Sequence, residues 1–294
     1  MTDAALNEGF ETLLRALRDS LDYVQGHFLY GSEQEQAEAH RHIARTLLLC
    51  LERDVLQDPD YPSFRVLDPR SKEGMDNSDQ RYLLCPLNPD RTYRVHGERG
   101  TTRRLDFQIL RGIAFDAVDG AGSLVSVLTT EELGVDESGH FELFLGGEPR
   151  ETNWLELCEG PQSIMIRQIC SDWDVEVPGS IHIDCLETLG SPRPALDIPE
   201  MAARWETTAK HFASLVRYWP DFGQSRWCSQ AAANELLPPA DFSDVGGLPG
   251  REMAGGHFDL AEDEALVITT WPSEARYQGI QLGHHWWESL EDGD

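Results

Sequence analysis

The stretch that decides the fold is "RYLLCPLNPDRTYRVHGERGTTRRLDFQILRG", residues 81–112. It contains three short apolar or alternating runs, and Pro, Asn, Asp or Gly residues separate them. Similar runs follow: "GSLVSVLTT" (122–130), "HFELFL" (140–145), "SIMIRQIC" (163–170) and "SIHIDCL" (180–186). Strands of this length and spacing predict an antiparallel β-sandwich or jelly roll.

Alternation within these runs assigns side chains to faces. In "HFELFL", Phe141, Leu143 and Leu145 fall on one face, and we expect that face to be buried. His140 and Glu142 fall on the opposite face. A second base–carboxylate pair, His182 and Asp184, shares a face in "SIHIDCL" in the same way. In such a pair the carboxylate can orient the imidazole for acid–base catalysis. Ordinary exposed strand faces carry the same pattern, so the sequence leaves a catalytic pair and a surface pair both open.

Helices are predicted before the first strand. Apolar residues at i, i+3, i+4 and i+7 spacing predict an amphipathic helix over residues 4–25. A second helix is predicted over 33–56, with Ser32 as its N-cap and Glu35 three residues later, as in a capping box. We expect the histidines of the predicted helices to lie on the surface; they are His27, His40, His42 and His211.

The chain returns to helix after the strands. A helical pair is predicted over about 198–236, with Asp197 as a cap and Pro220 as the end of the first helix. The stretches "EALVITTWP" (264–272) and "ARYQGIQLGHHWWESL" (275–290) are interpreted as two further strands.

These elements predict an α+β chain in four parts. Residues 1–62 form a helical segment packed on the sheet, and 63–190 form the first part of the β-sandwich. Residues 191–240 are a helical insertion, and 241–294 are a C-terminal β part.

Composition excludes several classes of function. A formal net charge of −28 argues against a track for nucleic-acid phosphates, which needs clustered basic residues. No apolar run is long enough to predict a membrane span, and no signal peptide is visible. The six cysteines lack zinc-site spacing and are expected to be free thiols, mostly buried. We therefore expect a cytoplasmic protein, and a homo-oligomer is left open.

The loop "GMDNSDQ" at 74–80 is the first candidate site. Asp76, Asn77 and Asp79 place three oxygen-bearing side chains within four residues. Three interpretations stay open: a structural turn, a binding or acid–base site, and a hard-cation site. The loop does not fit an EF-hand, and we predict no metal. Arg81 and Tyr82 begin the following strand and are expected to contribute to ligand binding.

The stretch "LGHHWWESL" is the second candidate site. His284 and His285 are the predicted imidazole groups, and Trp286 is a predicted ligand contact. Trp154 is predicted to join the same aromatic pocket, which suits a flat apolar ligand. Trp173, Trp271 and Tyr277 are further aromatic residues available to it. An ordinary aromatic core is the alternative.

Arg167 is a candidate for binding an anionic ligand. It lies inside the predicted strand "SIMIRQIC", where a buried guanidinium needs a partner. Asp172 or Asp174 would serve as an internal partner, and a carboxylate on a ligand would serve equally well.

Four ordered blocks of sequence resemble an uncharacterised bacterial family, the domain of unknown function numbered twelve-fourteen. The blocks are "RSKEGMDNSDQRYLLCPLNPDRTYRVHGERGTTRRLDFQI", "ETNWLEL", "SIMIRQICSDWDVEVPGSIHI" and "ALVITTWPSEARYQGIQLGHHWWESLE". Ser78 stands where the family usually has proline. The family pattern continues past "ESLE", so the resemblance implies a short or truncated member. It also implies a two-part β-sandwich or jelly roll, and it supplies no settled activity.

The sequence lacks a GxSxG elbow, a P-loop and a GxGxxG motif, which disfavours serine hydrolases, NTPases and dinucleotide dehydrogenases. We therefore expect a cofactor-free enzyme that acts on an apolar small molecule through carboxylate and imidazole groups. The alternative is a non-catalytic protein of the same fold that binds a small molecule or is structural.

Overall fold

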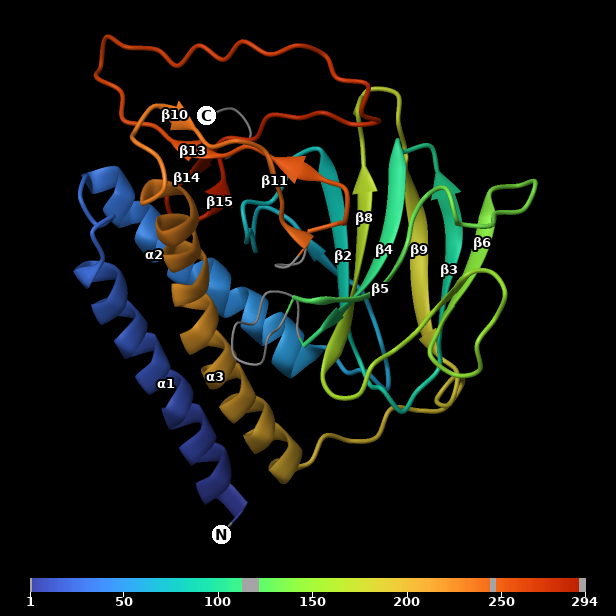
Figure 1. Cartoon of the computed structure of the whole chain (residues 1–294). Helices are drawn as coiled ribbons and strands as arrows, with labels where there is room; N and C mark the ends of the chain where they lie inside the picture. The colour runs from blue at the N-terminus through green and yellow to red at the C-terminus, as the bar shows by residue number, and fades with distance from the viewer. Residues whose placement is uncertain (1, 113–121, 244–246, 291–294) are drawn as a thin grey trace.

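The computed structural model describes residues 2–112, 122–243 and 247–290. It is mixed α+β, as the sequence predicts, with helices gathered on one side and the main strands on the other (Figure 1). The helices are α1 (Thr2–Gly26), α2 (Glu33–Cys50) and α3 (Ile198–Gly223), and π-helical turns extend α2 and α3 as η1 (Leu51–Leu56) and η3 (Gln224–Cys228).

Nine strands form two sheets in the described residues. The larger has the spatial order β1 (Arg65–Leu67), β2 (Gln80–Leu87), β8 (Gln162–Ile169), β4 (Arg104–Arg111) and β5 (Leu124–Leu128). The smaller has the order β7 (Trp154–Leu155), β6 (His140–Leu145), β3 (Tyr93–Gly100) and β9 (Pro178–Cys185). Every pairing is antiparallel except that of β6 with β7.

One hydrophobic cluster joins the two sheets. It contains Leu83 and Cys85 of the larger sheet and Val95 of the smaller one. The alternation predicted for β6 is confirmed, because positions 141, 143 and 145 are buried and 140 and 142 are exposed. Strand β8 is buried along its whole length, which shows that both faces of the larger sheet are covered near its centre.

The helices pack mainly against one another. Apolar residues of α1, α2 and α3 form a separate cluster that includes Leu13, Leu49 and Phe212. Both predicted caps are confirmed: Ser32 forms a capping box with Glu35, and the Asp197 carboxylate accepts a hydrogen bond from the backbone N–H of Glu200. None of the described helices is long and apolar enough to cross a membrane. All six cysteines are free.

Pro220 does not end its helix, so that prediction is wrong. Helix α3 runs through Pro220 to Gly223, and η3 continues from there. Proline cannot donate the helical bond to the carbonyl four residues earlier, which is that of Val216. A ring nitrogen of His42 lies 3.0 Å from this carbonyl oxygen. A tertiary contact thus replaces the missing helical bond. His42 is buried, and the expectation of a surface position is wrong for this residue and for His211.

The C-terminal region differs most from its prediction. The described residues after η3 contain only two-residue strands: β10 (Glu235–Leu236), β11 (Ala240–Asp241), β12 (Glu252–Met253), β13 (Gly256–His257), β14 (Gly283–His284) and β15 (Glu288–Ser289). The stretch at 264–272 is irregular, and its Val267 and Trp271 are each 83% exposed. Alternation favours a strand only where a partner edge supplies backbone hydrogen bonds, and the described chain offers this stretch none. The second helix of the pair predicted over about 198–236 is also much shorter than expected. After α3, only residues 224–228 are helical.

Candidate functional site

The loop before β2 is shaped by its own side chains. The Asn77 side-chain oxygen accepts a hydrogen bond from the backbone N–H of Asp79, at 2.8 Å, as in an Asx turn. The hydroxyl oxygen of Tyr82 accepts another from the backbone N–H of Asn77. Strand β2 then begins at Gln80 and pairs with β8. The turn interpretation therefore describes the backbone of this loop, and the outward side chains are left for other contacts.

The same loop forms one wall of an open cavity of about 540 Å³. Its lining residues come from β1 and the turn after it, from the loop and the start of β2, and from the loop after β8; they are Val66, Leu67, Asp68, Pro69, Ser78, Asp79, Gln80, Arg81 and Trp173. Arg81 alternates with Leu83 and Cys85, whose side chains belong to the cluster between the sheets. The cavity therefore lies at the end of the larger sheet where the loop enters β2.

Two side chains in the cavity wall, Arg81 and Trp173, are exposed to a ligand. Among the described residues, the exposed Arg81 guanidinium has no hydrogen bond or ion pair to another side chain. The side-chain oxygen of Gln80 is buried without a hydrogen-bond partner in the same part of the chain. Trp173 is 49% exposed and offers an aromatic face. A cation and an aromatic ring at one cavity suit a small organic molecule with a polar head.

Asp79 is coupled to Tyr277 at the edge of this cavity. The Tyr277 hydroxyl donates a hydrogen bond of 2.6 Å to Asp79 Oδ2, and it accepts one of 2.9 Å from the Asn77 amide. Burial and the bond to Asp79 raise the pKa of Tyr277 well above its usual value. The phenol therefore stays protonated at neutral pH and acts as a donor.

A C-terminal segment, 276–282, is held on the loop by these contacts. Besides Tyr277, the side-chain oxygen of Gln281 accepts hydrogen bonds from the backbone N–H and the hydroxyl of Ser78, at 3.1 and 3.0 Å. The loop therefore contacts a segment about 200 positions later in the sequence. The sequence indicated Tyr277 only as an aromatic residue available to a pocket. No pattern in the sequence predicted the contact of Gln281 with the loop.

Asp76 lies in a different environment, although it is in the same loop. It is only 9% exposed, and its two carboxylate oxygens accept hydrogen bonds from the backbone N–H and the hydroxyl of Ser289, at 3.1 and 2.8 Å. Burial raises the pKa of the Asp76 carboxyl, and the bonds to Ser289 oppose that shift. Asp76 therefore ties the loop to β15 and is not part of the cavity lining.

The residue before Ser289 is the centre of a buried polar network. Glu288 is 1% exposed, and its carboxylate lies 2.9 Å from His42 Nδ1 and 2.6 Å from Arg45 Nη1. The bonds and charges of His284 and His42 outweigh the burial of Glu288 and hold its pKa at about 2. We name Glu288, His42, Arg45, Asp76 and Ser289 the Glu288 network. It fastens the C-terminal hairpin to the helices and to the loop before β2.

The predicted imidazoles belong to this hairpin. His284 Nε2 lies 3.5 Å from Glu288 Oε2 and 3.7 Å from Glu38 Oε2 of α2. Burial lowers the pKa of His285, which favours its neutral form. Neither histidine lines the cavity beside Asp79. The structure therefore separates the predicted imidazoles from the predicted carboxylate Asp79, and it links His284 to Asp76 only through residues 288 and 289.

The remaining predicted ligand contacts are dispersed. Trp286 is buried against α1 and α2, where its ring N–H donates to the backbone oxygen of Glu35. Trp154 belongs to the smaller sheet, and its ring N–H donates to the backbone oxygen of Gly146. Tyr82 is buried on the helix-facing side of the larger sheet. Arg167 lies over its ring, with the guanidinium carbon 5.2 Å from the ring centre.

The two base–carboxylate pairs on strand faces form surface contacts. Asp184 accepts a hydrogen bond from Arg94 at 2.7 Å and lies 3.0 Å from His96, whose ring is tilted against that of His182 at 5.7 Å between ring centres. His140 faces Glu98 at 3.5 Å. Among the described residues, no group of three or more His, Cys, Asp and Glu side chains is arranged to hold a metal ion.

Comparisons with known proteins give a likeness of fold. No protein-family model matches the chain, and no curated protein matches it. A solved structure of an uncharacterised protein from Burkholderia cenocepacia has a TM-score of 0.76 and 23% identity. The likeness spans 85% of this chain and 69% of that one. A Vibrio parahaemolyticus protein, VPA0106, has a TM-score of 0.27 and 14% identity over 44% of this chain and 31% of that one. The first comparison supports the fold, and neither indicates a function.

Proposed function

We propose that the protein binds a small organic molecule in the cavity beside Asp79. The observation that carries this proposal is the exposed Arg81 guanidinium, which forms no hydrogen bond or ion pair to a described side chain, beside the half-exposed Trp173 ring in one cavity wall. This is the non-catalytic alternative of the two functions that the sequence left open.

The wall indicates the class of ligand. Val66, Leu67 and Pro69 supply apolar surface, and the Trp173 ring can stack on a flat body. Arg81 would contact a carboxylate, sulfonate or phosphate at one end of the molecule. A flat, mostly apolar organic anion meets all of these features.

Anilinonaphthalene sulfonate has this chemistry and serves as a fluorescent probe. We expect saturable binding to the folded protein, and we expect Trp173→Ala to weaken it by about two- to tenfold, because an aromatic contact contributes about 0.5–1.5 kcal/mol. Trp271→Ala is the matched control, since Trp271 is 83% exposed and outside the cavity lining. Non-saturable binding, or equal affinity in both variants, would contradict the proposal.

A second proposal is a cofactor-free acid–base enzyme at the same cavity. It rests on the 2.6 Å hydrogen bond between Asp79 and Tyr277, which places a carboxylate and a phenol donor together. Product formation from bound compounds, measured by mass spectrometry, would test it. Asp79→Asn and Tyr277→Phe should each abolish turnover, and turnover that survives both changes would exclude the pair.

Two finer points of classification belong with these proposals. We propose that the two sheets form a sandwich of the jelly-roll kind, which the cluster shared by their facing residues supports. Membership of the uncharacterised family also stays a proposal, carried by the ordered sequence blocks. Six free thiols favour the reducing cytoplasm.

A further inference from the structure

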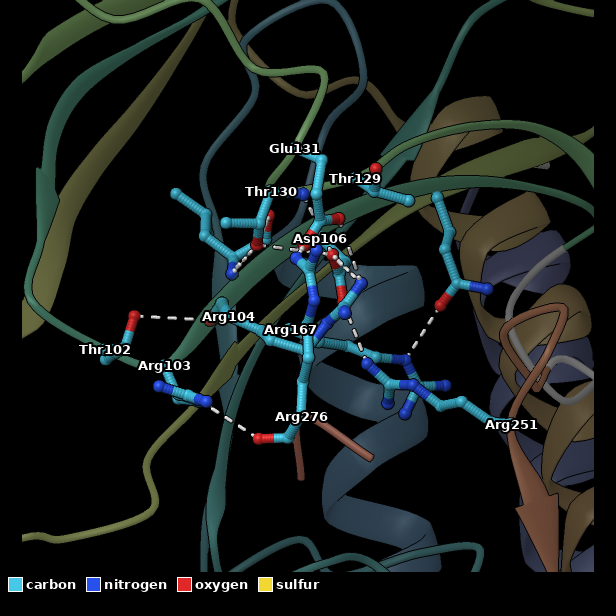
Figure 2. Close-up of polar contacts among 12 residues, drawn as sticks. Thr102, Arg103, Arg104, Asp106, Thr129, Thr130, Glu131, Arg167, Arg251 and Arg276 are labelled. Carbon is cyan, nitrogen blue, oxygen red and sulfur yellow. Dashed lines mark hydrogen bonds and ion pairs between the residues drawn. The ribbon is translucent and has the colours of Figure 1, made fainter. Parts of the chain in front are cut away.

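Three arginines gather around one aspartate on the helix-facing side of the larger sheet. Arg104 and Asp106 lie on β4, and Arg167 lies directly across from Asp106 on β8. Arg251 reaches the same place from the loop before β12. Figure 2 shows the three guanidinium groups around the Asp106 carboxylate. This arginine cluster, defined as Arg104, Arg167 and Arg251, is separate from the cavity beside Asp79.

The Asp106 carboxylate is fully buried and already well bonded. Arg104 donates to both of its oxygens, at 3.0 and 3.1 Å, and the backbone N–H of Thr130 adds a bond of 3.1 Å. Arg251 Nη2 donates to Asp106 Oδ2 at 2.8 Å. Asp106 thus serves two guanidinium groups and has little accepting capacity left, while Arg104 has a second acidic neighbour in Glu131 at 3.5 Å.

Arg251 and Arg104 keep donors that the described residues do not use. The bond to Asp106 is the only side-chain hydrogen bond of Arg251 to the described residues, although a guanidinium carries five N–H donors. Arg104 bonds to Asp106 through Nε and Nη2, and its Nη2 also lies 3.5 Å from Glu131 Oε2, so only its Nη1 forms no hydrogen bond to the described residues. These free donors are the part of the cluster that an anion can bind.

The third arginine adds positive charge behind the other two. Arg167 Nε donates to the Gln108 oxygen at 2.7 Å. Burial and the neighbouring charges of Arg167 and Arg104 together lower the pKa of Arg251 to about 10, against the opposing charge of Asp106. Like charges at close range in a partly buried place repel one another, and a bound anion would relieve that repulsion.

The cluster is open to solvent on the side of Arg251. The Arg251 side chain is 31% exposed and that of Arg104 is 18% exposed, whereas Asp106 is closed off. Arg103 and Arg276 lie at the rim: Arg103 donates to the backbone oxygen of Arg276, whose side chain pairs with Glu131. An anion can therefore approach the free guanidinium edges without entering the core.

We propose that Arg104, Arg167 and Arg251 form a binding site for a small oxyanion, either a carboxylate or a phosphate. The planar fork of a guanidinium matches both groups in a bidentate manner. In a chain with a net charge of −28, such a locally positive site selects anions against the field of the remaining surface. The ligand would bridge the free edges of Arg104 and Arg251, with Arg167 contributing charge.

The test uses the full chain with inorganic phosphate and with acetate, each titrated at an ionic strength held constant with chloride. We expect a saturable rise in the thermal midpoint with at least one of the two anions, and the more effective one identifies the class. Arg251→Gln should weaken the apparent affinity roughly tenfold or more, because bonds to charged groups contribute about 1.5–3 kcal/mol. Arg251→Lys keeps the positive charge but loses the planar guanidinium. Its affinity for the anion should therefore lie between those of the wild-type protein and Arg251→Gln.

Arg91→Gln is the matched control, because Arg91 is 32% exposed and pairs with the single carboxylate of Asp60. Its response to the anions should equal that of the wild-type protein. Shifts of arginine Nε–Hε signals in the wild-type protein give a readout that does not depend on any variant. No saturable response to either anion in wild type, or an unchanged response in Arg251→Gln, would overturn the site.

Discussion

Asp76 and Asp79 are three positions apart in one loop, and they end in opposite kinds of environment. Asp76 is buried and uses both carboxylate oxygens within the Glu288 network. Asp79 lines an open cavity, and one of its carboxylate oxygens accepts a hydrogen bond from the Tyr277 hydroxyl. The Glu288 network pairs its polar groups with one another, whereas the Arg81 guanidinium in the cavity wall forms no hydrogen bond or ion pair to a described side chain. Paired buried groups stabilise a fold, and unpaired groups at an open wall are available to a ligand.

The largest effect should come from breaking the centre of the Glu288 network. We expect Glu288→Ala to lower the free energy of unfolding by about 3–5 kcal/mol, because it removes the carboxylate that the buried Arg45 guanidinium and the buried His42 ring bond to. Urea unfolding measures the change. Glu142→Ala is the control, since Glu142 is 56% exposed and contacts Arg94 at 3.3 Å, and it should cost less than about 1 kcal/mol. Equal losses in both variants would remove the contrast between network and surface.

The same carboxylate should make stability sensitive to acid. The pKa of Glu288 is lowered from 4.5 to about 2 in the folded protein. Its contribution, about 3 kcal/mol, is therefore present above the unfolded pKa and is lost as the pH falls from about 5 towards 2. Unfolding free energies across this range should decline less steeply in Glu288→Gln than in wild type. Parallel curves for the two proteins would show that Glu288 does not carry this dependence.

The smallest effect compares the two aspartates directly. Asp76→Asn should cost about 1–2 kcal/mol, because asparagine can accept only one of the two hydrogen bonds from Ser289. Asp79→Asn should change stability by less than about 0.5 kcal/mol and should alter binding of the sulfonate probe in the cavity. Thermal melts and fluorescence titration of both variants separate these outcomes. A larger loss of stability for Asp79 than for Asp76 would reverse our assignment of the two roles.

Local patterns were sufficient for most of the fold. Helix α2 begins where Ser32 and Glu35 form their capping box, and β6 buries the face that alternation assigned to it. Both features depend on neighbours within a few residues, so the sequence contains them directly. The strand predicted at 264–272 failed for the opposite reason, since a strand needs a partner edge that no local pattern specifies.

The candidate site was only partly predictable. The loop with Asp79 and Arg81 was identified from its density of polar side chains, and both residues line the cavity. Its partners Trp173 and Tyr277 were noted only as available aromatics. The arginine cluster was represented by Arg167 alone, because Arg104 and Arg251 are 63 and 84 positions from it.

The sequence by itself determined the α+β class, the capped helices, the alternating strands and the acidic loop before β2. Each of these follows from residues that are close along the chain. The tertiary structure alone decided that Asp76 is buried against Ser289 while Asp79 faces the cavity, and that His42 bonds the Val216 carbonyl that Pro220 leaves open. Such roles depend on contacts between segments that are distant in sequence, and the packing of the whole chain determines those contacts.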